Sequence, residues 1–453
     1  MSVDKTLTIP NKLSLIREEL QKKQLSIVIL DDDPTGTQTM NNVPVVTTWA
    51  ENILEKELLK SPVFFILTNS RSLTTEKANE LSLQIGESLQ RLATKHNKKL
   101  LVISRGDSTL RGHYPNEVDA LAKGLGIPAA KHLLIPAFFE GGRYTYNDIH
   151  YVKERNSFIP VAETPFAKDN TFGYVSSDLK DWIVEKSNGN IKVENIASVS
   201  IELIKDKGVE GVASIIRSAA SYIIVNATKA QHLQTVALAC LQYDVPLLYR
   251  TAASFVNAIS GTAVKNCLTK DELFKNRKKG PALVVIGSYV PKTTRQLVYL
   301  QENFEACFLE FEVSKIDNPD LFSEEIHKIK KEVNTAIQKG KDVVLYTSRK
   351  VISGETKTAS LEIINRISEA LIKIVRDIQS RPGYIIAKGG ITSSDIAVKA
   401  LSAEKANVMG QVIKGVPVWQ LGDNSKYPKL PYIVFPGNVG NDAAIYDVLK
   451  LLQ

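Results

Sequence analysis

Cysteine is scarce in this chain of 453 residues, which has only Cys240, Cys267 and Cys307. An odd number of widely separated cysteines without CxxC spacing argues against a disulfide framework and against a thiolate metal site. The six histidines likewise do not cluster at the spacing of zinc ligands. We therefore expect unreactive thiols in a reducing compartment and no zinc site.

Long apolar runs are missing as well. No stretch reaches the roughly 18 uncharged apolar residues that a transmembrane helix needs, and Met1–Pro10 is too polar for a signal peptide. We expect a cytoplasmic protein without a membrane partner. Lysine and arginine outnumber aspartate and glutamate by 57 to 49, but they form no long basic block that would bind nucleic-acid phosphates. The positive charge fits an anionic small molecule instead.

Four motifs of large enzyme classes are also absent, namely GxxxxGK(S/T), HExxH, GxSxG and GxGxxG. Their absence argues against the reaction classes that depend on them. Short apolar runs instead alternate with amphipathic stretches, which is the pattern of βαβ units. The runs that we expect to form strands are Ser26–Leu30, Val63–Leu67, Leu100–Ile103, Leu133–Ile135, Ile223–Val225, Leu247–Tyr249, Ala282–Ile286, Asp342–Tyr346, Tyr384–Ala387 and Tyr432–Phe435.

This alternation predicts an α/β fold with two domains, each a largely parallel sheet flanked by helices. Residues 77–95 place apolar side chains three and four positions apart, as on one face of a helix. A charged segment with glycine and proline at 275–281 (KNRKKGP) separates the two sets of strands. Because the chain is too long for one core, we place a first domain at 1–260, a linker at 261–280 and a second domain at 281–453.

Polar loops follow several predicted strands of the first domain, and ligands of open parallel sheets bind at such strand ends. Residues 31–39 (DDDPTGTQT) place three carboxylates next to one another, and such a costly arrangement indicates a functional site. The alternative is an exposed acidic turn. Residues 104–113 (SRGDSTLRGH) contain two arginines that can bind a carboxylate or phosphate, beside carboxylate and hydroxyl groups that can bind sugar hydroxyls. The alternative is a solvated loop. Residues 136–142 (PAFFEGG), with Arg143 and Asn147, fit a turn as well as a substrate pocket.

Glycine-containing loops follow three predicted strands of the second domain. They are Gly287–Ser288, residues 388–394 (KGGITSS) and residues 435–442 (FPGNVGND). Adjacent glycines that lead into a helix let backbone N–H groups and the helix dipole face a phosphate. Each loop alone fits a structural turn, but three in one domain favour a nucleotide site.

Together these motifs resemble the four-carbon acid sugar kinase family, over nearly the whole chain from about Ile27. The resemblance implies ATP-dependent phosphorylation of a terminal hydroxyl on a four-carbon sugar acid such as erythronate, threonate or a 3-oxo-tetronate. It implies that the N-terminal domain holds the sugar acid and that the C-terminal domain holds ATP. The motifs that carry it are DDDPTGTQT (31–39), SRGDSTLRGH (104–113), RTAASF (250–255), GSYVPKTTRQL (287–297), KGGITS (388–393) and PGNVG (436–440).

The resemblance also assigns residues. It places Ser288, Gly389, Gly390, Ile391, Thr392 and Gly437 at nucleotide-binding positions, and Asp32, Asp33, Arg105, Asp107, Ser108 and Arg111 on the substrate side. A kinase needs a proton acceptor and Mg²⁺, and either of the two aspartates could serve as base or metal partner. We expect the two arginines to hold the substrate carboxylate. Pro34 and Ile391 stand where leucine and an acidic residue are usual in the family, which leaves the choice of sugar acid open.

Two other functions remain open on the sequence. One is a sugar-acid aldolase, isomerase or dehydratase that uses the acidic loop and a divalent metal without nucleotide. The other is a non-catalytic sensor that binds nucleotide and sugar acid but transfers no phosphate. ATP binding would exclude the first, and phosphate transfer would exclude the second. For the kinase we expect ATP and Mg²⁺ as cofactors, a small sugar acid as substrate and a homodimer by default.

Overall fold

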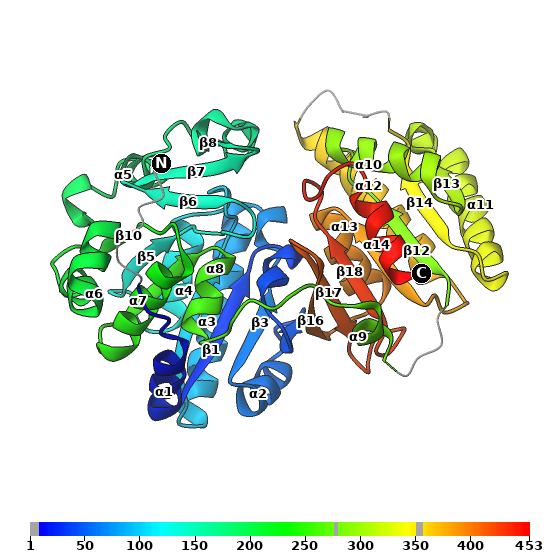
Figure 1. The fold of residues 1–453 in the computed structure, drawn as a ribbon. Helices are drawn as coiled ribbons and strands as arrows, with labels where there is room; N and C mark the ends of the chain where they lie inside the picture. Colours follow the sequence, from blue (N-terminus) through cyan, green and yellow to red (C-terminus); the bar gives the residue numbers. More distant parts are fainter. Residues whose placement is uncertain (1–8, 276–279, 350–356) are drawn as a thin grey trace. The chain divides into compact units, whose positions relative to one another are not determined.

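The computed structural model describes residues 9–275, 280–349 and 357–453. Both parts of the chain are α/β, as the alternation of apolar and amphipathic segments predicts (Figure 1). The chain divides into two compact units, the first made of Met1–Met40 and Thr48–Val264 and the second of Asn41–Thr47 and Lys265–Gln453.

Parallel strands form the central sheet of the first unit, in the order β3-β1-β4-β11-β5-β10-β9. Nearly all side chains of β3 are buried, which explains its continuous apolar sequence VFFIL. The strands predicted for this unit are present, with ends that differ by no more than a few residues. The strand bounds are β1 (Leu25–Asp31), β3 (Val63–Leu67), β4 (Lys99–Arg105), β5 (Lys131–Ile135), β9 (Ile196–Val199), β10 (Tyr222–Val225) and β11 (Leu247–Thr251).

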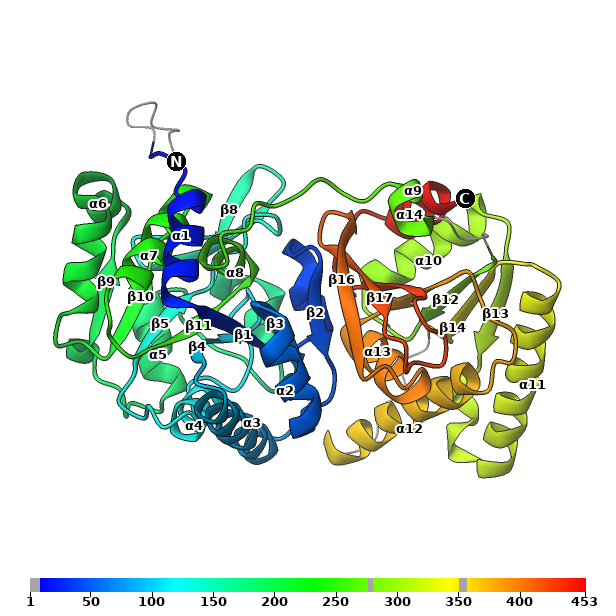
Figure 2. The ribbon, with the colours of Figure 1, turned by 90° about the horizontal axis from the view of Figure 1, so that it is seen from below.

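Helices cover both faces of this sheet. One face carries α2, α3 and α4, and the other carries α1, α6, α7 and α8 (Figure 2). On α3, Leu81, Ile85, Leu89 and Leu92 form the buried stripe that the spacing predicts. The helix bounds are α1 (Leu13–Lys23), α2 (Glu51–Lys60), α3 (Thr75–Lys95), α4 (Asn116–Gly124), α5 (Leu179–Lys186), α6 (Ile201–Ile216), α7 (Ala230–Gln242) and α8 (Ala253–Ile259).

A small antiparallel sheet follows β5 in the chain. It consists of β6 (Arg143–Tyr146), β7 (Ile149–Glu154) and β8 (Ser157–Pro160). Most of its side chains are at least partly exposed, so these strands lack the apolar runs by which the other strands are recognised. This sheet places Arg143 and His150 beside the loop that follows β4, as the contacts described below show.

The sheet of the second unit has the order β13-β14-β12-β15-β18-β17-β16-β2. Its first five strands are parallel, whereas β17, β16 and β2 extend the sheet through antiparallel pairs. The fold is therefore largely parallel with an antiparallel edge. The strand bounds are β2 (Val43–Val46), β12 (Ala282–Ile286), β13 (Cys307–Phe311), β14 (Val343–Thr347), β15 (Tyr384–Lys388), β16 (Lys405–Ile413), β17 (Val416–Leu421) and β18 (Pro431–Phe435).

Helices flank this second sheet as well. On one face α10 packs against α14, and on the other α12 packs against α11 and α13 (Figure 2). Val284 and Ile286 of β12, Phe435 of β18 and Leu449 of α14 share one buried apolar core. The helix bounds are α9 (Lys270–Phe274), α10 (Pro291–Asn303), α11 (Pro319–Gln338), α12 (Lys357–Arg376), α13 (Gly390–Asp395), a π-helical turn (Ile396–Ala400) and α14 (Ala444–Leu452).

One strand of the second sheet comes from the early part of the chain. β2 pairs antiparallel with β16, with Val46 level with Lys405 and Val43 level with Val408 (Figure 2). Three further hydrogen bonds anchor the segment, because the N–H groups of Asn42 and Thr47 and the Thr47 hydroxyl donate to carbonyl oxygens next to β16 or in it. Residues 41–47 are thus built into the second unit.

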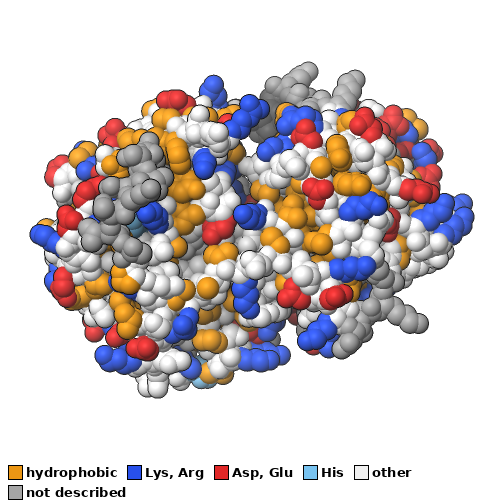
Figure 3. Space-filling view, in the orientation of Figure 1, with side chains coloured by type: hydrophobic (Ala, Val, Ile, Leu, Met, Phe, Trp, Pro, Cys, Tyr) orange, Lys and Arg blue, Asp and Glu red, His pale blue; other side chains and the backbone are white. Residues whose placement is uncertain are grey.

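The surface shows ordinary charge patterning. On the face drawn in Figure 3, basic side chains lie among acidic and apolar ones. Within the described ranges, no helix combines the length and apolar character that a membrane span requires.

Candidate active site

Four strands of the first unit end side by side at one edge of its sheet. Asp31 at the end of β1 is level with Leu67 of β3 and with Arg105 of β4, and Arg105 is level with Thr251 of β11. The loops that follow these strands therefore meet, as at the binding edge of an open parallel sheet. This edge holds the two motifs at 31–39 and 104–113.

Asp31 and Asp32 are buried at this edge, with exposed fractions of 1% and 2%. Arg105 Nη1 lies 3.1 Å from Asp31 Oδ1 and 3.6 Å from Asp32 Oδ1. Burial raises the pKa of Asp31 to about 7 and the pKa of Asp32 to about 6, although neighbouring arginines oppose both shifts. Among the described residues, Asp31 Oδ2 and both Asp32 oxygens have no hydrogen-bond partner. Buried acceptors of this kind indicate a place where a ligand or a water molecule can donate the missing hydrogen bonds.

Arg71 joins the acidic groups of two loops. It lies on the short 3-10 turn η2 (Ser70–Ser72) that follows β3. Its Nε is 3.3 Å from Asp32 Oδ2, its Nη2 is 2.6 Å from Asp33 Oδ2, and its Nη1 is 3.7 Å from Asp107 Oδ1. Arg71 was not predicted as a site residue, since it belongs to no recognised motif. Its place just after an apolar strand was the available signal.

Arg250 of β11 is a second buried arginine that was missed as a site residue. Its Nη1 lies 2.5 Å from Glu117 Oε1 and 2.9 Å from Ser104 Oγ, and its Nη2 lies 3.8 Å from Asp32 Oδ2. A Cβ atom on Gly106 would lie 2.3 Å from Arg250 Cζ. The loop after β4 therefore needs glycine at this position, because any side chain would displace the guanidinium.

Asp33 has a different environment from the two buried aspartates before it. Its Oδ1 accepts a hydrogen bond from the Thr35 N–H at 2.7 Å, which caps the 3-10 helix η1 (Pro34–Thr39). Its Oδ2 pairs with Arg71. Both oxygens of Asp33 are thus engaged in holding the loop, whereas those of Asp32 are not hydrogen-bonded. Of the two candidates for the base, Asp32 is better placed to accept a proton.

Asp107 and Arg111 form an ion pair within the loop, with Asp107 Oδ2 at 2.8 Å from Arg111 Nε. Burial favours a raised pKa for Asp107, but the charges of Arg111 and Arg71 and the hydrogen bonds from Arg111 and Thr109 together outweigh it, so the pKa lies well below its usual range. Arg111 Nη1 is also 3.5 Å from Asp169 Oδ2. The Cζ atoms of Arg111 and Arg143 lie 5.2 Å and 5.7 Å from the centre of the Phe166 ring. Two guanidinium groups therefore gather around one aromatic ring.

Ser108 is buried and is fixed through its backbone. Its carbonyl oxygen lies 2.8 Å from His150 Nε2, which must donate, while His150 Nδ1 lies 3.0 Å from the Thr145 hydroxyl. Burial lowers the pKa of His150 to about 4, so the ring is neutral near pH 7. His113 Nε2 lies 3.0 Å from the Ser70 carbonyl oxygen. Both histidines thus brace loops of the site.

Three strand ends also meet in the second unit. Lys388, the last residue of β15, is level with Ile286 of β12 and with Phe435 of β18. The three glycine loops predicted in the second domain therefore lie together at one edge of the sheet. We refer to Gly287–Ser288, Gly389–Thr392 and Gly437 as the glycine cradle.

Ser288 lies between two glycines of the cradle. A Cβ atom on Gly437 would lie 3.0 Å from Ser288 Oγ, and a Cβ atom on Gly389 would lie 3.1 Å from Ser288 Cβ. A Cβ atom on Gly287 would lie 2.3 Å from Thr392 Oγ1. A side chain on Gly287 would displace the Thr392 hydroxyl, and side chains on Gly389 or Gly437 would press on Ser288. The structure thereby brings Ser288, Gly389, Thr392 and Gly437 together.

Gly390 and Ile391 begin α13. Gly389 stands at the N-cap and has no side chain to bond the first N–H groups of the helix, which leaves those groups for an anion. Ile391 has an exposed fraction of 49%, and its apolar side chain offers no hydrogen-bond donor to a phosphate. Any contact of Ile391 with phosphate would therefore come from its backbone N–H.

Two cations next to the cradle were not predicted as site residues. Arg349 follows β14, and its Nη1 donates to the Ser288 carbonyl oxygen at 2.7 Å. Lys388 donates from Nζ to the Pro436 carbonyl oxygen at 2.6 Å. A lysine at the end of an otherwise apolar strand was the available signal for Lys388.

Replacement of Gly389 by alanine tests the cradle. Gly389 has φ of +119°, which alanine adopts only at a cost of about 1–3 kcal/mol, and the new methyl group would press on Ser288. We expect the dissociation constant for ATP, measured by calorimetry, to rise at least about 10-fold. The matched control is Gly340→Ala, which has φ of +72° but no atom near the added Cβ. Equal effects of the two variants on ATP binding would contradict the assignment.

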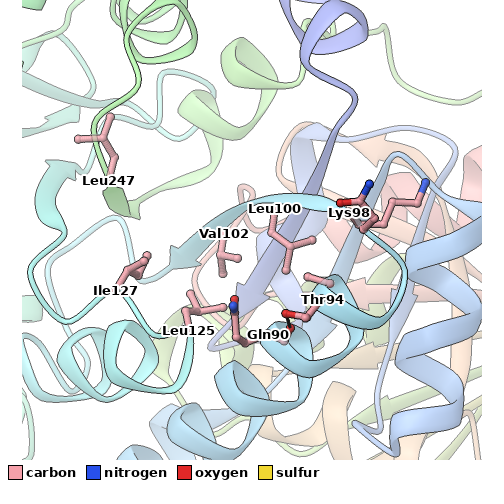
Figure 4. Close-up of a pocket in the computed structure, with 10 residues that line it drawn as sticks. Gln90, Thr94, Lys98, Leu100, Val102, Leu125, Ile127 and Leu247 are labelled. Atoms are coloured by element: carbon pink, nitrogen blue, oxygen red, sulfur yellow. Dashed lines mark hydrogen bonds between the residues drawn. The ribbon is translucent and has the colours of Figure 1, made fainter.

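One open pocket of the first unit lies away from these loops. A pocket of about 390 Å³ lies at the opposite end of β4, where Leu100 and Val102 line it, and Lys98 is its one charged lining residue (Figure 4). A cavity of about 10 Å³, with room for about one water molecule, borders Asp107 and Arg250. The second cavity adjoins the buried acids and arginines of the loops described above.

Comparisons with known proteins match two separate ranges of this chain to two domain models. Residues 27–259 match the model of a sugar-binding N-terminal domain, and residues 283–445 match the model of a nucleotide-binding C-terminal domain. D-threonate kinase from Salmonella typhimurium is 26% identical over 376 residues, which cover 78% of this chain and 81% of the relative. D-erythronate kinase from Heliobacterium modesticaldum is 24% identical over 457 residues, which cover 94% of this chain and 97% of the relative.

A solved structure shares the fold. It is a Haemophilus influenzae protein from a family described as a domain of unknown function, with a TM-score of 0.63 and 17% sequence identity. The match covers 94% of this chain and all of that protein. Since the two domain models together span most of the sequence, this chain belongs to the four-carbon acid sugar kinase family.

Proposed function

We propose that this protein is an ATP-dependent kinase that phosphorylates a terminal hydroxyl of a four-carbon sugar acid, namely erythronate, threonate or a 3-oxo-tetronate. The observation that carries the proposal is Asp32, a buried carboxylate among three arginines with both oxygens free of hydrogen bonds within the described part of the chain. The names of the two curated relatives point to the same substrate class. In this proposal residues 1–260 bind the sugar acid and residues 281–453 bind the nucleotide.

Arg111 and Arg143 hold the carboxylate of the sugar acid in this proposal. Both lie at the Phe166 ring, and Arg143 Nε has no hydrogen-bond partner among the residues described. Arg105 was expected to share this task, but it is 3% exposed and is occupied with Asp31 and Asp32. We therefore assign Arg105 to neutralising these acids. Asp107 and Ser108 remain the candidates for contacts with the sugar hydroxyls.

Asp32 accepts the proton of the attacking alcohol. The alcohol oxygen forms a bond to the γ-phosphorus while the bond from this phosphorus to the oxygen bridging to the β-phosphate breaks, and the alcohol proton passes to Asp32. A carboxylate with a pKa of about 6 is ionised at neutral pH and is basic enough for this task. Arg71 and Arg250 lie near its Oδ2 atom and Arg105 near its Oδ1 atom, and these charges hold the carboxylate in place.

The glycine cradle holds the phosphates of ATP. Backbone N–H groups at the start of α13 and the hydroxyls of Ser288 and Thr392 fit phosphate oxygens in both charge and donor type. When bound together with ATP, Mg²⁺ would supply positive charge that offsets the negative charge building up during transfer.

An assay of ADP release tests the proposed function. The protein is incubated with ATP and Mg²⁺ and with a panel of three- to six-carbon sugar acids, including both erythronates, both threonates and their 3-oxo forms. We expect ADP release with one of the four-carbon acids. ATP binding without turnover on any acid would favour a sensor, and failure to bind ATP would favour the nucleotide-independent enzyme.

Replacement of Arg111 by alanine tests the carboxylate site. Loss of a charge-assisted hydrogen bond costs about 1.5–3 kcal/mol, so we expect the KM for the sugar acid to rise about 10- to 100-fold while the affinity for ATP stays the same. Steady-state kinetics and calorimetry measure the two effects. The matched control is Arg91→Ala, which removes an exposed arginine of α3 that pairs with Glu51. Equal losses for sugar acid and ATP would refute the division between the units.

A further inference from the structure

Lys388 is a buried lysine without an acidic partner. Its exposed fraction is 0%, its Nζ donates to the Pro436 carbonyl oxygen at 2.6 Å, and its Nζ lies 4.1 Å from the centre of the Phe435 ring. Across the described residues, no carboxylate lies within ion-pair distance of it, and the charge that acts on it is that of Lys292, another cation. A charged ammonium group in such a place is costly unless something compensates it.

The position of Lys388 links it to the glycine cradle. Gly389 follows it in the chain, and Pro436, which accepts its hydrogen bond, precedes Gly437. These two glycines are the ones that approach Ser288 most closely. Because glycine carries no side chain, a phosphate group in the cradle can come near the backbone that Lys388 contacts. Opposite charges at short range interact strongly in a desolvated site.

The lysine is uncharged in the free protein at mildly alkaline pH. Burial lowers the pKa of Lys388 to about 6, and repulsion by Lys292 adds to the shift. Lys292 belongs to α10, and its Nζ donates to the Asn438 carbonyl oxygen at 3.2 Å, so its ammonium group contacts the loop that contains Pro436 and Gly437. The approach of several negative charges reverses this balance and favours the ammonium form.

We propose that Lys388 takes up a proton when the phosphates of a nucleotide bind in the glycine cradle, and that it then serves as their counter-charge. The inference rests on the proposed function, because it takes the cradle as the nucleotide site. The proton comes from solvent and joins the lone pair of Nζ, and no bond of the nucleotide breaks. Binding is therefore linked to pH, and affinity falls up to about 10-fold for each pH unit above neutrality.

Calorimetry of ATP binding tests this inference. ATP with Mg²⁺ and without sugar acid is titrated into the protein at pH 8, above the last phosphate pKa of about 6, in two buffers with different ionisation enthalpies. The difference in observed enthalpy gives the number of protons taken up. We expect close to one proton per ATP for the wild-type protein, since a group with a pKa of about 6 is almost fully deprotonated beforehand.

Lys388→Gln is the informative variant, because glutamine can still donate to the Pro436 carbonyl oxygen but cannot carry a charge. We expect it to take up no proton and to bind ATP about 10-fold more weakly at pH 7. Lys292→Met is the matched control and should retain proton uptake. A glutamine variant with unchanged affinity and uptake would overturn the inference.

The wild-type result separates this inference from the proposed function, even if the glutamine variant does not fold. Binding of ATP without proton uptake would refute the role of Lys388 and leave the kinase proposal standing. Absence of ATP binding would refute both.

Discussion

Replacing Asp32 by asparagine should lower kcat about 1,000-fold while leaving the affinity for ATP unchanged. The variant keeps the size of the side chain but removes the group that accepts the alcohol proton, and general bases contribute about 10²- to 10⁴-fold to rates. The rate of ADP release with the preferred sugar acid measures kcat, and calorimetry measures ATP affinity.

The matched control for this variant is Asp33→Asn. Asparagine can cap a helix as well as aspartate does, so the loop keeps its shape, and we expect less than about a 10-fold loss of kcat. The two aspartates are neighbours in the chain, but the oxygens of Asp33 accept a hydrogen bond from Thr35 and pair with Arg71 at 2.6 Å, whereas those of Asp32 have only longer contacts with arginines. Equal losses for both variants would show that the structure does not distinguish their roles.

The pKa of Asp32 predicts how the rate depends on pH. Since burial raises the pKa of Asp32 to about 6, the ionised form predominates above pH 6 and is lost as the pH falls through that value. We expect kcat to decrease about 10-fold per pH unit below pH 6. Asp31 lies beside Asp32 and its pKa is raised to about 7, so the titration belongs to the pair. A rate that stays constant from pH 8 to pH 5 would contradict a carboxylate base.

Replacing Arg71 by methionine should destabilise the first unit by about 3–5 kcal/mol, the range for breaking a buried ion pair from one side. The change leaves Asp32, Asp33 and Asp107 without the guanidinium that now stands between them. Chemical denaturation at pH 8 measures the loss of free energy of unfolding. The deficit should shrink as the pH falls through about 6, because protonation of Asp32 then relieves the repulsion.

Arg91→Met is the control for Arg71, because the ion pair of Arg91 with Glu51 is exposed on both sides. Exposed pairs contribute about 0–1 kcal/mol, so we expect a loss within that range. If the Arg71 variant lost no more stability than this control, the acids would not depend on Arg71.

Most strands of both units could be predicted from the sequence. Parallel strands covered on both faces are continuous apolar runs, and Val63–Leu67 and Ala282–Ile286 begin and end where the sequence predicts. The ends of such strands also locate polar loops, which is why the motifs at 31–39 and 104–113 were found. The domain boundaries at 260 and 281 stay a prediction.

The residues that the sequence did not reveal were missed because their roles depend on contacts made only in the folded chain. Arg71 and Arg250 act through carboxylates that are far from them in the sequence, and no local pattern reports such a contact. The different environments of Asp32 and Asp33 depend on which neighbour the fold supplies, so the sequence left the choice of base open. β2 has only four residues and is recognised as part of the second sheet through β16 alone.

The place of β2 has a consequence for biosynthesis. A ribosome completes residues 41–47 long before it makes Lys405–Ile413, the strand with which they pair. Domains generally fold as units while the chain emerges, yet the second unit cannot close its sheet until this early segment returns to it. Pairings of such long sequence separation form slowly. A truncated chain that begins at residue 281 would therefore leave β16 without its partner and expose a strand edge prone to aggregation.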